Sequence, residues 1–214
     1  MKFNRKNPYH YFIYISYTLF FFFSLFLVAF KKTRNNTIYL MGHKLGGNLQ
    51  SLLESQEKIE YDFKYLTFDK YLIKNNDYCI SYLSIKNIVN LLSCKIIIAT
   101  HGILFHKIIK GRKIKTVNIG HGVQTIVIDK NSSGLSLFDE VWLSSNFDKN
   151  ILINKCNYNS NNLFTTGFIK HKVILENERV KDDIKINENL KYNYWLYAPT
   201  ASSKKINEEI NIFH

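Results

Sequence analysis

The hydrophobic pattern sets an amino-terminal apolar segment apart from the rest of the chain. Residues 11–30 contain no charge, no Gly and no Pro, and a helix of about 20 such residues is long enough to cross a bilayer. Basic residues flank the segment on both sides, at Lys2, Arg5, Lys6, Lys31, Lys32 and Arg34. We therefore expect a single amino-terminal transmembrane helix, with residues 1–34 as a membrane anchor.

The flanking charge leaves the orientation of this anchor open, because three basic residues lie on each side of it. A cleaved signal peptide is the alternative interpretation. The apolar stretch is long for such a peptide, however, and no small-residue cleavage site follows it. The pattern therefore favours an anchor that is retained.

After the anchor, runs rich in β-branched and aromatic residues alternate with segments in which apolar residues recur at helical spacing. The strand-like runs are residues 37–41, 61–67, 95–100, 116–120 and 140–144. The segments with helical spacing are residues 48–54, 85–92, 105–109 and 147–153. This alternation predicts an α/β domain over residues 35–190, in which helices cover both faces of a doubly wound, Rossmann-like parallel sheet.

The last part of the chain has a different character. Residues 180–190 are rich in charge and predict a linker or a solvated helix, and residues 194–198 have the composition of a new strand. We expect residues 191–214 to be the truncated start of a second domain.

Composition adds constraints on the partners and on the compartment. The net charge is +12, but the lysines are scattered and do not form the clustered basic face of a nucleic-acid-binding protein. Background composition or a phosphate-rich partner accounts for this charge, and no nucleic-acid partner is expected. The three cysteines are far apart and form no C-x-x-C pair. They indicate neither a disulfide framework nor a zinc site, and they fit a reducing, cytosolic setting.

Two His-Gly pairs are the candidate chemical groups. His101-Gly102 follows the strand-like run 95–100, and His121-Gly122 follows the run 116–120. Ligands of open parallel sheets bind at the carboxyl ends of the strands, and adjacent strands would place both imidazoles at one edge. A histidine there can act as a general base, because its pKa lies near the operating pH. A structural histidine at a strand end is the alternative for each pair.

Cofactor and metal sites are not indicated. The glycines of residues 42–47 lack the spacing of a dinucleotide fingerprint, so we interpret this segment as a tight structural turn. No Asp, Glu or Cys close to the His-Gly pairs completes a metal-ligand set. We expect no cofactor and no metal.

Five short segments follow one another in an order that is found in a known family of transferases. They are Gly47-Asn48 with Leu52, residues 117–123 (V-N-I-G-H-G-V), residues 141–149 (V-W-L-S-S-N-F-D-K), residues 163–170 (L-F-T-T-G-F-I-K) and residues 197–200 (Y-A-P-T). In this order they resemble the amino-terminal half of the CDP-glycerol glycerophosphotransferases, which transfer glycerol or ribitol phosphate in teichoic acid synthesis. The resemblance implies a GT-B-like fold, with residues 35–190 as the acceptor-side domain and residues 191–214 as the start of the donor-binding domain.

The resemblance also implies a reaction and a set of site residues. His121 falls on the proposed catalytic base, which takes a proton from an acceptor hydroxyl so that its oxygen attacks the β-phosphorus of CDP-glycerol and expels CMP. Gly122, His101, Lys170 and Thr200 are the expected substrate-binding residues. The implied partners are CDP-glycerol or a similar activated donor, a lipid-linked polymer acceptor and the membrane, with the globular part on the cytoplasmic side.

Some positions depart from the family pattern. Gly120 stands where the family has Trp, and Ile169-Lys170 stands where it has Pro-Arg. The segment that would bind the donor is absent from these residues. A GT-B glycosyltransferase of surface polysaccharide synthesis and a non-catalytic, truncated membrane scaffold therefore remain as alternative functions.

Overall fold

The computed structural model describes residues 7–30, 35–42, 45–56, 61–120, 134–167 and 169. The chain divides into two compact units, residues 1–175 and 176–214, and all described residues belong to the first. The expected linker at residues 180–190 and the expected strand at residues 194–198 lie outside the described residues. The fold below is that of the first unit alone.

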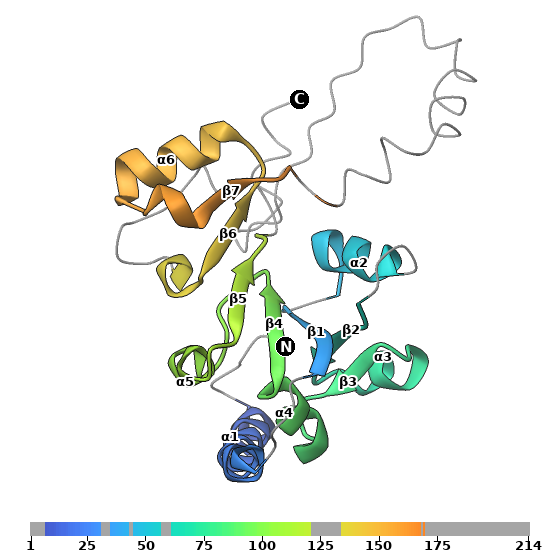
Figure 1. The fold of residues 1–214 in the computed structure, drawn as a ribbon. Helices are drawn as coiled ribbons and strands as arrows, with labels where there is room; N and C mark the ends of the chain where they lie inside the picture. Colours follow the sequence, from blue (N-terminus) through green and yellow to red (C-terminus); the bar gives the residue numbers. More distant parts are fainter. Residues whose placement is uncertain are drawn as a thin grey trace, which may run out of the picture. The chain divides into compact units, whose positions relative to one another are not determined.

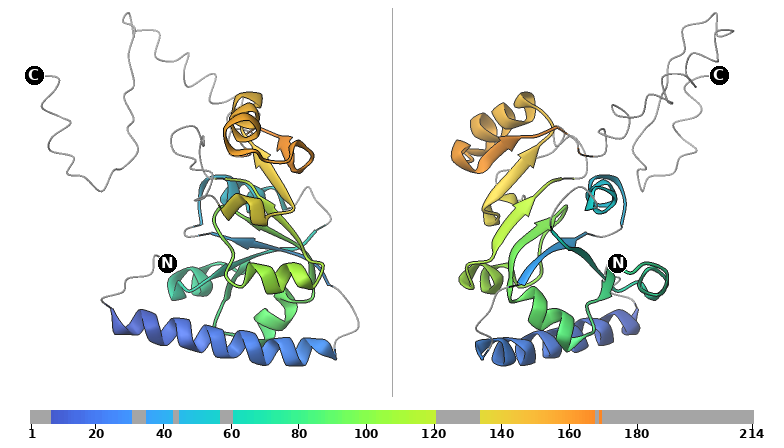
Figure 2. Two further views of the ribbon diagram at one scale, coloured as in Figure 1. Left: turned by 90° about the vertical axis from the view of Figure 1, so that its left-hand side faces the viewer. Right: turned by 45° about the vertical axis from the view of Figure 1, so that its right-hand side comes forward.

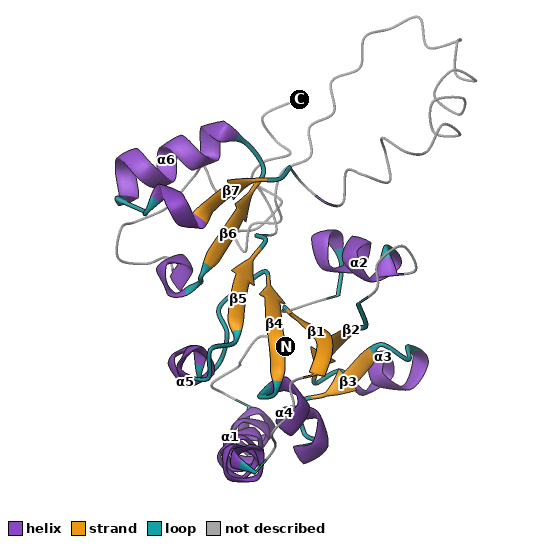
Figure 3. Ribbon diagram, viewed as in Figure 1, coloured by secondary structure: helices purple, strands orange, loops and turns teal. Residues whose placement is uncertain are grey.

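A parallel sheet with helices on both faces forms the first unit (Figures 1 and 3). Its described strands are β1 (Asn35–Met41), β2 (Phe63–Thr67), β3 (Cys79–Ser81), β4 (Cys94–Ala99), β5 (Lys115–Asn118), β6 (Glu140–Leu143) and β7 (Leu163–Thr165). The described helices are α1 (Pro8–Ala29), α2 (Gly47–Glu54), α3 (Lys70–Asn75), α4 (Ile85–Leu91), α5 (His106–Gly111) and α6 (Asn146–Cys156), with short 3-10 turns η2 (Gly134–Leu137) and η3 (Ser160–Asn162).

The strand order is that of a doubly wound sheet. The described strands run β3-β2-β1-β4-β5-β6-β7, and every pair is parallel. The order reverses between β1 and β4, which is the topological switch point at which such sheets bind ligands. The predicted α/β fold is therefore confirmed.

Alternating side chains of each strand build a separate core on each face of the sheet. In β1, Tyr39 and Met41 join the core beneath α1, α4, α5 and α6, whereas Ile38 and Leu40 join the core beneath α2. Because helices cover both faces of the sheet, the central strands are nearly continuous runs of apolar residues. The run in β4 is the clearest example.

The structure contains three short elements that the hydrophobic pattern did not predict. β3 and β7 have only three residues each, which is too short for an alternating pattern to stand out. α3 has six residues, none of them buried, and it begins where the Asp69 side chain accepts hydrogen bonds from the N–H groups of Tyr71 and Leu72.

Helix α1 is the long apolar element that the sequence predicts. It has 22 residues, and Asn7 caps it by accepting a hydrogen bond from the N–H of Tyr9. By length and composition it can cross a membrane, a property that signal sequences and some buried core helices share. In the structure it lies beside α4 on one face of the sheet (Figure 2). One row of side chains along α1 is buried against the rest of the domain. This row, called the Tyr17 lane below, consists of Ile13, Tyr17, Phe21, Ser24 and Val28.

A polar cluster fastens α5 to the amino end of β5. His106 Nε2 lies 3.1 Å from Thr116 Oγ1, and the N–H and hydroxyl of Thr116 donate to Asp139 at 2.8 and 2.9 Å. Lys110 forms an ion pair with Asp139 at 3.2 Å. Burial, aided by the positive charge of Lys110, lowers the pKa of His106 below its ordinary value. His106 is therefore a structural histidine, held beside the amino end of β5 and not at the carboxyl edge.

Candidate functional site

Three strand ends meet at the carboxyl edge of the sheet, at its switch point. Met41 of β1 pairs with Ala99 of β4, and Ala99 pairs with Asn118 of β5. The backbone contacts continue one residue further, because the N–H of Thr100 donates to Met41 O at 3.1 Å and the N–H of Ile119 donates to Ala99 O at 2.9 Å. The segment that carries His101 and the residues immediately before His121 therefore leave the sheet side by side.

His101 lies at this edge. Its side chain is half-buried, and Nδ1 lies 2.9 Å from the hydroxyl oxygen of the preceding Thr100. Gly102 is exposed, and a Cβ at this position would meet no atom within 4 Å. The edge beside His101 is thus open to a ligand, and one ring nitrogen is oriented by a neighbouring hydroxyl.

A cavity of about 550 Å³ opens at the switch point, between the strand ends and α1. Its walls come from Met41 and Gly42 after β1, Thr67 and Phe68 after β2, Tyr82, the segment His101, Gly102 and Leu104 after β4, and five residues of α1: His10, Tyr11, Ile13, Tyr14 and Tyr17. Aromatic and aliphatic side chains dominate this lining, and two imidazoles provide polar contacts. Such a mixture is typical of a small-molecule site.

The end of β5 is held by a residue of α2. Gly120 has φ of +57°, and its N–H donates to the Asn118 side chain at 2.9 Å. The side-chain amide of Asn48, which is only 4% exposed, donates to the carbonyls of Ile119 and Gly120 at 3.2 and 3.3 Å. The first turn of α2 therefore fixes the backbone immediately before His121.

Four of the five expected site residues are not part of the structural description. His121, Gly122, Lys170 and Thr200 lie outside the described residues, so their roles stay predictions. The contacts of Asn48 were not predicted from the sequence. The Gly47-Asn48 match to the family drew attention to this residue, but no local pattern could show that it contacts residues more than 70 positions away.

A second group missed by sequence reasoning lies after β6. The hydroxyls of Ser144 and Ser145 both donate to Asp148 Oδ2, and the N–H of Asp148 donates to Ser145 Oγ at 3.2 Å. Asp148 is 3% exposed, and its Oδ1 has no hydrogen-bond partner among the residues described. The reciprocal Ser145 and Asp148 bonds cap α6, and the spacing of three residues was the available signal.

The described part of the chain contains no cluster of three or more His, Cys, Asp or Glu side chains that could hold a metal ion. Its three cysteines, Cys79, Cys94 and Cys156, are buried and form no disulfide with one another. The chemistry at the carboxyl edge is therefore built from imidazole, amide, hydroxyl and backbone groups.

Comparison with known proteins adds a structural likeness. No protein-family model and no curated protein matches the sequence. Solved structures do match, with a TM-score of 0.57 over 84% of this chain at 9% identity for one of them. That structure is the wall teichoic acid polymerase TagF. The chain shares the fold of TagF.

A structure of a TagF variant gives the same result. A histidine-to-asparagine variant soaked with CDPG (CDP-glycerol) matches with a TM-score of 0.55 over 81% of this chain, at 12% identity. In both comparisons this chain covers 49% of the TagF structure, so it spans about half the length of TagF. At such identities the likeness establishes the fold and not the activity. The GT-B-like α/β fold implied by the motif order is confirmed.

Proposed function

We propose that this protein is the acceptor-side half of a membrane-associated transferase. It moves glycerol phosphate, or a related polyol phosphate, from a CDP-activated donor to a lipid-linked surface polymer, as in teichoic acid or capsule synthesis. The observation that carries this proposal is the TagF fold, with His101 and the residues that lead into His121 at the switch point of the sheet. The motif order in the sequence supports it independently of the fold.

His121 is the proposed general base. It takes the proton of an acceptor hydroxyl, the acceptor oxygen forms a bond to the β-phosphorus of CDP-glycerol, and the bond from that phosphorus to the bridging oxygen breaks. CMP leaves with the electron pair, and the proton stays on the imidazole. Phosphoryl transfer of this kind depends mostly on positioning and on charge stabilisation. The Asn48 bonds to Ile119 and Gly120 support such positioning.

The other expected residues bind substrate in this proposal. His101 lies in the wall of the cavity at the switch point, where it can contact the acceptor. Lys170 supplies positive charge to the transferred phosphate, and Gly122 and Thr200 are the other proposed substrate-binding residues. Because the chain spans about half of TagF, donor binding is proposed for the full-length protein.

The test is CMP release from CDP-glycerol in the presence of a lipid-linked acceptor, measured on the full-length protein. We expect His121→Ala to abolish release, because no other group then takes the hydroxyl proton. His106→Gln is the matched control, since His106 is buried against Thr116 at the other end of β5 and should leave turnover in place.

Two results would contradict this proposal. Equal turnover by the wild type and by His121→Ala would remove His121 from the reaction. Heat stabilisation by a sugar nucleotide, with none by CDP-glycerol, would assign the protein to the glycosyltransferases that share this fold.

A further inference from the structure

Helix α1 is docked on the globular domain along one side. Phe105, which precedes α5, stacks on Phe21 with ring centroids 4.4 Å apart and on Tyr17 at 5.9 Å. Tyr17 also meets Tyr82 edge-on at 5.3 Å. Tyr17, Phe21 and Ser24 are each 0% exposed. Tyr17, Phe21 and Val28 of this lane belong to the same core that fills one face of the sheet.

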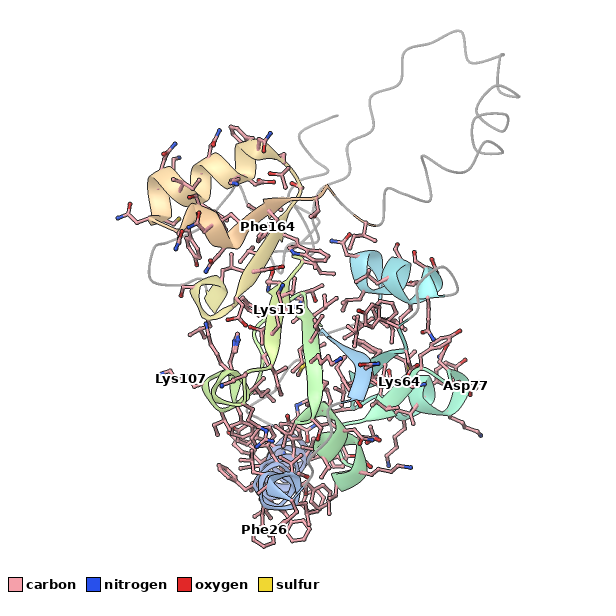
Figure 4. All side chains as sticks on the ribbon, viewed as in Figure 1. Phe26, Lys64, Asp77, Lys107, Lys115 and Phe164 are labelled. Carbon is pink, nitrogen blue, oxygen red and sulfur yellow. The ribbon has the colours of Figure 1, made fainter. Side chains whose placement is uncertain are left out.

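The other side of α1 is apolar, and the residues that the structure describes leave most of it uncovered. Large hydrophobic side chains are exposed there along its whole length, including Phe12, Ile15, Leu19, Phe22, Phe23 and Phe26. Figure 4 shows Phe26 on the side of α1 that faces away from the sheet. A contiguous apolar surface of this kind marks an interaction site, because monomeric soluble proteins rarely expose one. A helix that is hydrophobic all round needs an apolar environment on every side.

The docked lane is incompatible with a helix that crosses a bilayer. From Ile13 to Val28 the contact extends over about 22 Å of helix, which is most of a hydrocarbon core of about 30 Å. A spanning α1 would either lose this contact or draw α4 and α5 into the hydrocarbon. Lys86 of α4 and Lys107 of α5 are both exposed, and charged side chains are costly at that depth.

We propose that α1 lies along the surface of an anionic phospholipid bilayer, with its Phe-rich side in the lipid and its Tyr17 lane docked on the domain. An interfacial helix normally has a polar face that points away from the lipid. Here the side of α1 that points away from the lipid is instead covered by the domain. Exposed Tyr9, Tyr11 and Tyr14 suit the headgroup level of such a surface.

The positive charge near α1 indicates which partner covers its exposed apolar side. Three basic residues precede the apolar segment, three follow it, and the whole chain carries +12. Lys86 and Lys107 lie one and two residues from groups that contact α1, since Ile85 O accepts from Ser24 Oγ at 3.4 Å and Phe105 stacks on Phe21. Basic residues beside an interfacial helix attract anionic lipid headgroups. If a second protein covered this side of α1, the basic residues around it would have no role.

Depth measurement by spin labelling distinguishes a helix in the membrane plane from one that crosses. Phe12, Leu19 and Phe26 are 66%, 64% and 63% exposed, so Phe12→Cys, Leu19→Cys and Phe26→Cys place labels along the free side. The native cysteines are buried, and wild type treated with the same spin label gives their background. On phosphatidylglycerol vesicles we expect the three labels at one shallow depth. A Leu19→Cys label at the bilayer centre, with the other two near opposite surfaces, would overturn the proposal.

Vesicle sedimentation of the whole chain tests the choice of lipid. We expect at least tenfold stronger binding to phosphatidylglycerol vesicles than to phosphatidylcholine vesicles, and weaker binding at high salt. Equal binding to both, insensitive to salt, would contradict the role of charge. Neither measurement involves transfer, so their failure would leave the proposed reaction untouched, and loss of CMP release would leave α1 untouched.

Discussion

At the scale of single residues, Asn48 is the clearest link between sequence motif and site. Its amide is buried and donates to two consecutive backbone carbonyls, those of Ile119 and Gly120. Both acceptors belong to the segment that leads into His121. A residue at the start of one helix thereby controls the backbone at the end of a strand that lies far along the chain.

We expect Asn48→Ala to lower the free energy of unfolding by about 1–3 kcal/mol, because it removes the amide donor from two carbonyls in a buried setting. Urea unfolding followed by circular dichroism measures this. Gln50→Ala, on the same helix, is the matched control, since Gln50 is exposed and bonds to Glu54 at 2.8 Å. Its effect should stay within about 0.5 kcal/mol. Equal losses in the two variants would mean that the Asn48 contacts contribute little.

His106 predicts a pH dependence of stability. Burial, followed by the charge of Lys110, lowers its pKa in the folded state, so the unfolded chain binds a proton more readily than the folded one. The stabilising contribution is complete above the unfolded value of about 6.5 and is lost as the pH falls below it toward the folded pKa. Urea midpoints from pH 7.5 to 5 should therefore decrease, and His106→Gln should flatten this decrease.

Asp139 acts in a lower pH window and does not obscure this test. Burial alone would raise its pKa, but bonds from the N–H and hydroxyl of Thr116 and the charge of Lys110 lower it below the ordinary value of 3.8. Its contribution is lost only as the pH falls below that value. An unchanged pH dependence in His106→Gln would show that His106 is not the group responsible above pH 5.

At the scale of elements, α1 shows how one helix meets two kinds of surroundings. Its sequence is apolar on all sides, so the pattern alone indicates a membrane span. The structure instead packs α1 against the domain (Figure 2), where one lane of its side chains is buried against Phe105, Tyr82 and Phe68, while large apolar side chains elsewhere on the helix are exposed. The same side chains are thus divided between a protein core and an outer apolar face.

Tyr17 offers a sharp test of the docked lane. Its hydroxyl is buried and has no hydrogen-bond partner within the described ranges. Tyr17→Phe keeps the ring and removes an unpaired polar atom, so we expect unchanged stability or a gain of about 1 kcal/mol. Tyr17→Ala should cost about 3–5 kcal/mol, as truncation of a buried aromatic side chain does. Thermal unfolding in vesicles measures both, and two equally harmless variants would show that the lane is not docked.

At the scale of the whole molecule, the carboxyl edge of the sheet and α1 belong to one arrangement. Five residues of α1 line the cavity at the switch point, beside the end of β4. If α1 rests on a bilayer, that cavity lies close to the lipid surface, where a lipid-linked acceptor is also held. The likeness to TagF covers about half of the TagF chain.

The sequence by itself determined the local elements and their class. Apolar periodicity depends on neighbouring residues, so β1, β2, β4, β5 and β6 and the helices α2, α4, α5 and α6 were predicted close to their observed bounds. The alternation of these elements was enough to predict a doubly wound parallel sheet. The three-residue strands β3 and β7 were missed because so few residues carry no periodicity.

Only the tertiary structure decided which distant groups meet. The Asn48 bonds to the end of β5, the position of His101 in the cavity wall and the docking of α1 through Phe105 all join residues that are far apart in the chain. Such contacts depend on strand order and on the packing of helices over each face, which no local pattern encodes. The two His-Gly pairs were recognised as candidates from sequence, but only the pairing of β4 with β5 shows that the strands which precede them end at one edge.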